Sequence, residues 1–271
     1  INIVLKKNAQ AGTHGSALAG LNSQGGYNGS VNISHRLERL EAYGSYDHNQ
    51  VNLLGRNAMR EDQTIQRFKN GAPDGSSRVL AVEERDIRSY NLKAGLKLRP
   101  WAGGQVRGEF LRGLQREDKT KVVDTRAYKP NGSFASRARQ TENQVEDYAF
   151  NQYLLEYTQR IGQNGHLTTA YNRVDSDQPK PRTLSTQKLT EAGANLDARP
   201  DLQRIQETNT DRNQFAQADY GHRLGAGLSV AGGLKWSQRE RRGEQTTEKF
   251  NYSTQQFVAS QNGANNFFAA E

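Results

Sequence analysis

Apolar and polar residues alternate along Ser89–Leu111 with a period of two. The first arm of this segment places five apolar residues on one parity, Tyr90, Leu92, Ala94, Leu96 and Leu98. The residues between them are Asn91, Lys93, Gly95 and Lys97. This pattern predicts a β-strand with one face toward an apolar medium and the other toward water. A turn at 99–104 contains a proline and two glycines, and a second arm alternates in the same way, so the segment is predicted to be a β-hairpin.

The same alternation recurs along the chain and predicts an all-β, antiparallel, up-and-down fold. About nine strands are expected, near residues 15–22, 27–36, 40–52, 88–98, 105–116, 149–161, 166–175, 213–224 and 228–238. Short turns are expected near 37–39, 99–104, 162–165 and 225–227. Long polar loops are expected at 55–86, 116–146 and 175–211, with turns at Pro73–Ser76 and Pro130–Ser133. No strand is expected in the polar segment after residue 238.

The lengths of these connections indicate what kind of sheet the strands form. In an up-and-down sheet, alternate connections lie at the same end, so the short turns gather at one end and the long loops at the other. Short periplasmic turns and long extracellular loops are typical of outer-membrane β-barrels. Aromatic residues fall at or near strand ends, where they would form interfacial girdles: Tyr90, Tyr153, Tyr171, Tyr220, Trp101 and Trp236. We therefore expect a transmembrane barrel wall.

Composition agrees with strands that have only one apolar face. Hydrophobic residues make up 34% of the 271 residues, and the mean hydropathy is −0.93. No stretch approaches the roughly 18 consecutive apolar residues of a transmembrane helix. The chain has no cysteine, which excludes disulfides and cysteine-based metal sites. Its net charge of +8 is typical of a solvated basic surface and also suits anionic partners such as lipopolysaccharide, acidic substrates or nucleic acid.

Candidate catalytic chemistry is absent from the sequence. The five histidines are scattered without metal-ligand spacing, and neither a Gly-x-Ser-x-Gly elbow nor a phosphate-binding Walker loop occurs. The acidic pairs Glu61-Asp62 and Glu83-Glu84 lie in the expected polar loops and are interpreted as solvated carboxylates. We therefore expect no enzyme activity, no catalytic residues, no metal and no cofactor.

The first residues, Ile1-Asn-Ile-Val-Leu-Lys-Lys7, resemble the last plug strand of TonB-dependent receptors, which precedes the barrel. The glycine-rich Gly15–Asn22 and the segment Tyr27–Arg36 look like the first barrel hairpin of that family. The resemblance implies that residues 1–9 are the C-terminal strand of a plug domain and that residues 10–271 are the N-terminal part of a barrel. Family members have about 22 strands and a plug, so the chain is expected to be a partial barrel without most of the plug, the TonB box and the closing strands.

The resemblance also implies a function and partners. The protein would take up a scarce ligand, such as a siderophore, a cobalamin-like molecule or an oligosaccharide, across the Gram-negative outer membrane. Its partners would be the TonB energy-transducing complex, outer-membrane lipid and lipopolysaccharide. No nucleic-acid partner is expected. Charged residues on the polar parity would face the lumen, where they contact the plug or line the ligand path: Lys93, Lys97, Arg107, Glu109, Glu156 and Asp219.

Other interpretations stay open at this point. A non-energised porin or a surface adhesin barrel fits the same pattern, and so does a soluble basic β-sheet module that binds polysaccharide or nucleic acid. The basic run Arg239–Arg242 suits either lipopolysaccharide phosphates or plain solvation where a strand leaves the membrane.

Overall fold

The computed structural model describes residues 11–23, 25–225 and 227–270, with the last ten described by their backbone only. The expected plug strand at residues 1–9 lies outside the described residues. The remainder is all-β, as the alternation predicts. Among the described residues, no helix is long and apolar enough to cross a bilayer.

Twelve strands form one antiparallel sheet in the described part of the chain. They are β1 (Gly12–Leu21), β2 (Tyr27–Arg36), β3 (Leu40–Leu53), β4 (Met59–Lys69), β5 (Ala72–Leu98), β6 (Gly104–Tyr128), β7 (Phe134–Ile161), β8 (Gly165–Pro179), β9 (Arg182–Leu189), β10 (Asp201–Arg223), β11 (Ser229–Asn251) and β12 (Gln256–Ala270). A 3-10 turn, Gly55–Asn57, follows β3.

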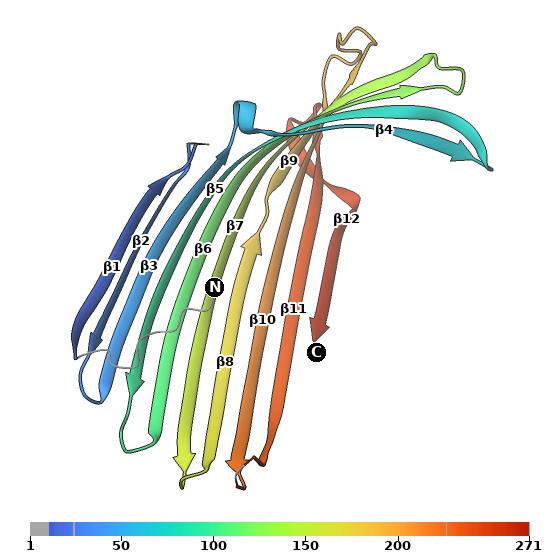
Figure 1. Cartoon of the computed structure of the whole chain (residues 1–271). Coiled ribbons are helices and arrows are strands. Elements are labelled where there is room, and N and C mark those ends of the chain that lie inside the picture. Colours follow the sequence, from blue (N-terminus) through green and yellow to red (C-terminus); the bar gives the residue numbers. More distant parts are fainter. Residues whose placement is uncertain (1–10, 24, 226, 271) are drawn as a thin grey trace.

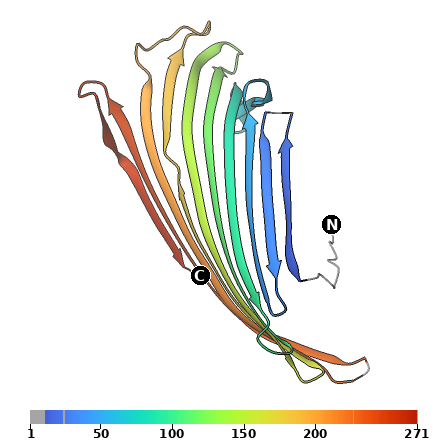
Figure 2. The ribbon, with the colours of Figure 1, turned by 90° about the vertical axis from the view of Figure 1, so that its left-hand side faces the viewer.

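The strands follow one another across the sheet in the order β1-β2-β3-β5-β6-β7-β8-β10-β11-β12 (Figure 1). Two short strands lie off this path, because β4 pairs with β5, and β9 pairs with both β7 and β10. Every pairing is antiparallel, so the up-and-down topology is confirmed. Figure 2 shows that the sheet curves along its strands.

The long polar stretches are strands and not loops, which corrects the sequence interpretation. β5, β6 and β7 run for 27, 25 and 28 residues and continue well past the upper ends of β1–β3, where they bend over at the top of Figure 1. Their upper parts pair residue by residue, as in Glu83 with Lys121 and Asp124 with Arg139. Charged side chains on both faces are compatible with a strand when the neighbouring strand supplies the opposite charge. The expected strand number was wrong in part for the same reason, since β4 and β9 are mostly polar. The expectation of no strand after residue 238 was also wrong, because β11 continues to Asn251 and β12 follows it.

The turns confirm most of the predicted positions. Short connections link β2 to β3, β5 to β6, β7 to β8 and β10 to β11, and all four lie at the end that we call the short-turn end, at the bottom of Figure 1. The turn at Pro130–Ser133 is also confirmed. The expected turn at Pro73–Ser76 is wrong, because that segment belongs to β5 and the chain reverses at Asn70-Gly71. Both residues of this pair have positive φ, 51° and 81°, which is the geometry of a two-residue hairpin turn that Asn-Gly favours.

Candidate functional site

The sheet carries an exposed apolar band on one face, which we call the apolar face. Directly paired residues share a face in an antiparallel sheet, and the predicted apolar parity of β5 continues onto its neighbours: Leu40, Leu98, Val106 and Tyr157 form one row, and Ala42, Leu96, Leu155, Tyr171 and Trp236 lie in the next. Tyr46, which is paired with Leu92, extends the band to Val31 on β2, so the band crosses the sheet from β2 to β11 without changing face.

Exposure in this band is the reverse of that in a water-soluble sheet. Leu92 and Leu96 are 50% and 57% exposed, whereas the side chain of Glu109, on the opposite face, is only 12% exposed. Along Tyr90–Leu98 each apolar residue is exposed and each intervening residue is half-buried. Contiguous exposed apolar surface of this extent indicates contact with another apolar phase or partner.

The band lies oblique to the strands. Its upper aromatic edge is at Tyr27 on β2 and at Trp236 on β11. Following the paired residues from Trp236 across seven strand boundaries leads to His35, which is eight residues from Tyr27 along β2 (27 to 35). At about 3.3 Å per residue and about 4.8 Å between strands, this offset corresponds to a tilt of about 40°. The span Tyr90–Leu98 then has a height of about 21 Å perpendicular to the band.

Aromatic rings mark the upper and lower edges of the band. At the upper edge the His48 ring lies between the rings of Tyr27 and Tyr90, with centroid distances of 5.0 and 4.4 Å. At the short-turn end Trp101 packs edge-on against Tyr157 at 6.5 Å, and its indole N–H donates to Gln159 at 2.6 Å. Rings with one polar tip at both edges and aliphatic residues between them form an amphipathic boundary.

Glu109 is the centre of a charged cluster on the opposite face, which we call the polar face. Its Oε2 accepts from the Tyr43 hydroxyl at 2.7 Å and from an Arg107 NH2 group at 2.7 Å, while its Oε1 lies 3.0 Å from the Lys93 ammonium. Arg107 Nε also donates to the Tyr43 hydroxyl at 3.0 Å. Three of the six predicted residues are therefore brought together, and the carboxylate has a donor on each side.

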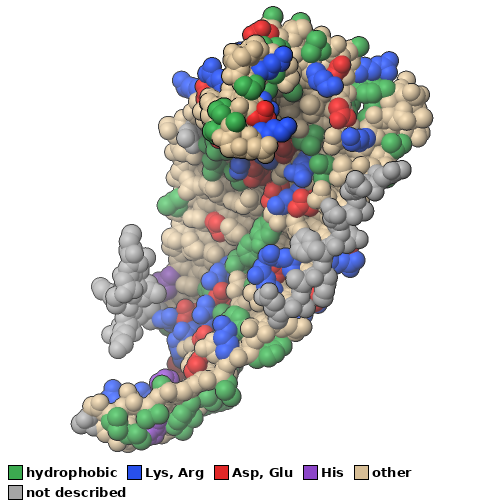
Figure 3. Space-filling view, turned by 90° about the vertical axis from the view of Figure 1, so that its right-hand side faces the viewer, with side chains coloured by type: hydrophobic (Ala, Val, Ile, Leu, Met, Phe, Trp, Pro, Cys, Tyr) green, Lys and Arg blue, Asp and Glu red, His purple; other side chains and the backbone are tan. Residues whose placement is uncertain are grey.

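The other three predicted residues share this face but not this cluster. Lys97 and Glu156 lie in the row of Arg107, to which both are directly paired. Asp219 lies further along the sheet on β10, where it accepts a hydrogen bond from Gln217 at 2.5 Å. Charged side chains of both signs gather beneath the overhanging upper part of the sheet in Figure 3.

Gly95 makes room for the Tyr43 ring within this cluster. A Cβ built on Gly95 would lie 2.3 Å from Tyr43 Cζ and 2.5 Å from its hydroxyl oxygen. We expect Gly95→Val to displace the ring and lower the free energy of unfolding by about 1–3 kcal/mol, measured by urea titration in detergent micelles. The control is Gly108→Val on the neighbouring strand, because nothing lies within 4 Å of its Cβ. Equal losses in both variants would contradict the assigned role of Gly95.

The upper parts of the long strands carry ion pairs that correct the interpretation of the acidic pairs. Glu83 is buried and pairs with Arg85 and with Lys121, the latter at 3.4 Å. Burial raises the pKa of Glu83, but hydrogen bonds from Arg85 and Lys121 outweigh it and hold this pKa below its usual value. Asp62 is half-exposed and pairs with Arg78 at 2.7 Å. Both carboxylates thus belong to strands and join them.

Asp124 on β6 has the most complete set of partners. Arg137 on β7 donates to both of its oxygens, with the shortest contact at 2.7 Å, and both side chains are buried. Arg139 adds a contact at 3.4 Å. The Arg137 hydrogen bonds hold the pKa of Asp124 below its usual range although desolvation opposes them.

The basic run Arg239–Arg242 is divided between the two faces. Arg239 and Arg241 both pair with Asp211 of β10, at 2.6 and 3.0 Å. Arg242 points to the opposite face of β11 and pairs with Glu244 at 2.7 Å. The structure therefore gives two of these arginines a carboxylate partner on the neighbouring strand.

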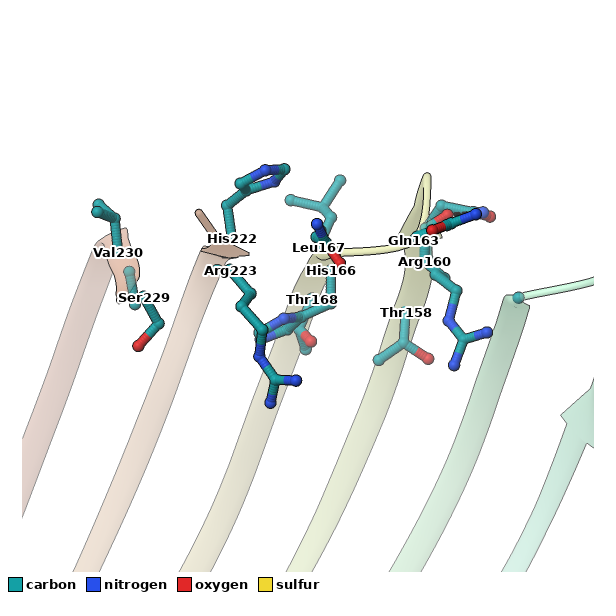
Figure 4. Close-up of a pocket in the computed structure, with 16 residues that line it drawn as sticks. Thr158, Arg160, Gln163, His166, Leu167, Thr168, His222, Arg223, Ser229 and Val230 are labelled. Atoms are coloured by element: carbon teal, nitrogen blue, oxygen red, sulfur yellow. Dashed lines mark hydrogen bonds between the residues drawn. The ribbon is translucent and has the colours of Figure 1, made fainter. Parts of the chain in front are cut away.

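Sequence reasoning missed Tyr43, although the residue interrupts an otherwise polar series on β3. It also missed a cavity of about 580 Å³ at the short-turn end, lined by residues of β7, β8, β10 and β11 (Figure 4). Arg160 on β7 and Arg223 on β10 line this cavity. Because β8 lies between these two strands, no pattern of nearby residues in the sequence could indicate that the two arginines lie together. Only the pairing of the strands brings them together.

The arrangement offers charged and hydrogen-bonding groups that could hold a ligand. Among the described residues, no group of three or more His, Asp or Glu side chains is placed to hold a metal ion. The charges of the polar face are mostly matched by partners on the same or neighbouring strands. Comparisons of the chain with known protein families, with curated proteins and with solved structures find no match.

Proposed function

We propose that the chain is part of the wall of an outer-membrane β-barrel that takes up a scarce ligand by energised transport, as TonB-dependent receptors do. The observation that carries this proposal is the exposed apolar band opposite a half-buried charged face. A lipid bilayer is the apolar phase that covers such a band on every strand at once, and a lumen needs the polar wall.

The dimensions of the band support a bilayer over a protein partner. The tilt of about 40° between strands and band falls within the roughly 35–45° of outer-membrane barrels. The height of about 21 Å between the aromatic edges is close to the roughly 25 Å apolar belt of such barrels. The long upper hairpins would extend into the extracellular space, and the four short turns would lie in the periplasm.

The energised mechanism and the ligand class are supported by the sequence alone. Ile1–Lys7 resembles the end of a plug, and a plug is the element on which the TonB complex would act. The charge-matched cluster around Glu109 would face the plug or the ligand path. A siderophore, a cobalamin-like molecule or an oligosaccharide remains the proposed cargo, without bond chemistry or a cofactor.

The test uses Gram-negative cells that express the full protein containing this chain. We expect it in the outer-membrane fraction with heat-modifiable gel migration. Accumulation of one of three probes, a ferric chelate, cobalamin or a maltooligosaccharide, should depend on an intact TonB complex. Equal uptake with and without that complex would indicate a porin and contradict energised transport. Recovery in the soluble fraction would contradict the membrane assignment.

A further inference from the structure

The cavity at the short-turn end opens on the polar face. Figure 4 shows Thr158, Arg160, Arg223 and Ser229 pointing to one side of the sheet and Leu167, His222 and Val230 to the other. The pairing agrees, since Thr158 and Arg160 share the parity of Glu156. The space of about 580 Å³ over this face of the strands is of the size that holds a small molecule.

The lining of this cavity is positively charged and contains no carboxylate among the described residues. Its charged side chains are Arg160 and Arg223, and its neutral polar groups include Thr158, Thr168 and Ser229. Many other arginines on the sheet meet carboxylates on the same or adjacent strands, as Arg107 meets Glu109. Within the described part of the chain, Arg160 and Arg223 have no such ion pair, so two guanidinium groups face the cavity unneutralised.

His166 lies on β8, the strand between the two strands that carry the arginines. It is directly paired with Arg160 on one side and with Gly221 on the other. A Cβ on Gly221 would lie 2.3 Å from His166 Cε1, so the ring lies over the glycine, two residues from Arg223. The backbones that carry the arginines are two strand spacings apart, about 10 Å. That separation suits a ligand with two anionic groups, one for each guanidinium fork.

We propose that this cavity binds a small polyanion with two or more carboxylate or phosphate groups. Each guanidinium would hold one group through paired N–H donors, which match the oxygens of both chemistries. The hydroxyls of Thr158, Thr168 and Ser229 supply further donors. Asp219 does not line the cavity, but it is directly paired with Thr168, which does, and so places a carboxylate next to the lining. This proposal goes beyond the proposed function, because binding of the polyanion depends only on how the strands are arranged and does not require that the protein transports a ligand.

The test measures binding of citrate and of pyrophosphate to the full protein containing this chain, purified in detergent, by isothermal titration calorimetry. We expect saturable binding of at least one probe. Binding of citrate alone would identify a carboxylate site, and binding of pyrophosphate alone would identify a phosphate site. The double variant Arg160→Gln/Arg223→Gln should weaken binding by about a hundredfold or more, since each lost charge-assisted hydrogen bond weakens binding by about tenfold or more. Asp219→Asn should strengthen it.

The matched control is Arg212→Gln, an arginine on the apolar parity of β10 that pairs with Asp175 at 3.0 Å. It should bind both probes like the wild type, and all variants should show wild-type circular dichroism. Absence of saturable binding to either probe would overturn the proposal, as would an equal loss in Arg212→Gln. Each result is independent of TonB-dependent uptake, so the two proposals fail separately.

Discussion

Leu155→Arg is expected to lower the stability of the protein in lipid by about 2–4 kcal/mol, the cost of a cation on the lipid face at mid-depth of a barrel. Leu155 lies within the apolar band, paired with Gly108 and Tyr171, and is 54% exposed. On the proposed lipid-facing surface, a guanidinium there would exchange water for hydrocarbon without a carboxylate partner. Folding yield into lipid vesicles and urea unfolding of the folded fraction measure the effect. Ala94→Arg, in the same band, should behave alike.

The preceding residue provides a control of the same chemistry. Leu154 lies on the polar face, directly paired with Glu109 and Asn172. Leu154→Arg places the same cation beside a carboxylate and water, and Lys93→Ala removes a cation from that face, so both should reduce the folding yield less than Leu155→Arg. Equal yields for the variants of both faces would contradict the lipid-facing assignment of the band.

Asp124→Asn is expected to loosen the upper β6–β7 hairpin, with amide hydrogen exchange there faster by about a hundredfold, because it leaves the buried Arg137 without its carboxylate. Hydrogen-exchange mass spectrometry measures the effect. Asp62→Asn, at a half-exposed pair with Arg78, should change exchange little. A comparable acceleration in both variants would contradict the importance of burial at Asp124.

The same carboxylate should make the hairpin sensitive to acid. The pKa of Asp124 is lower in the folded protein than in the unfolded chain, chiefly through the Arg137 hydrogen bonds. Its contribution to stability is therefore fully present above the unfolded pKa of about 3.9 and is lost as the pH falls through the lower folded value. Asp124→Asn should remove this part of the acid dependence. If the variant lost stability in acid as the wild type does, the acid sensitivity would have to come from other carboxylates.

The strand character of Ser89–Leu111 and the two faces of the central strands were predictable, because side chains of a strand alternate whatever its neighbours are. The three polar stretches were not. Glu83, Lys121 and Glu142 read as loop residues when each is taken alone, since charge and polarity are common to loops and to strands with paired charges. Their partners are distant in sequence, and only the register of the sheet joins them.

The candidate site was likewise predictable from the sequence only in part. The placement of Lys93, Lys97, Arg107, Glu109 and Glu156 on one face follows from parity. The cluster around Glu109 additionally requires Tyr43, which is 66 residues away and reaches the carboxylate across Gly95. The cavity of Arg160 and Arg223 likewise depends on three strands that pair in one register.

By itself the sequence determined the all-β class, the short turns and which side chains of the central strands share a face, because these depend on residues one or two positions apart. The tertiary structure alone decided how far the strands extend, how the apolar band tilts across them and which charges meet. Those properties depend on the register between strands, which the hydrogen-bonded ladder fixes over long distances in the chain.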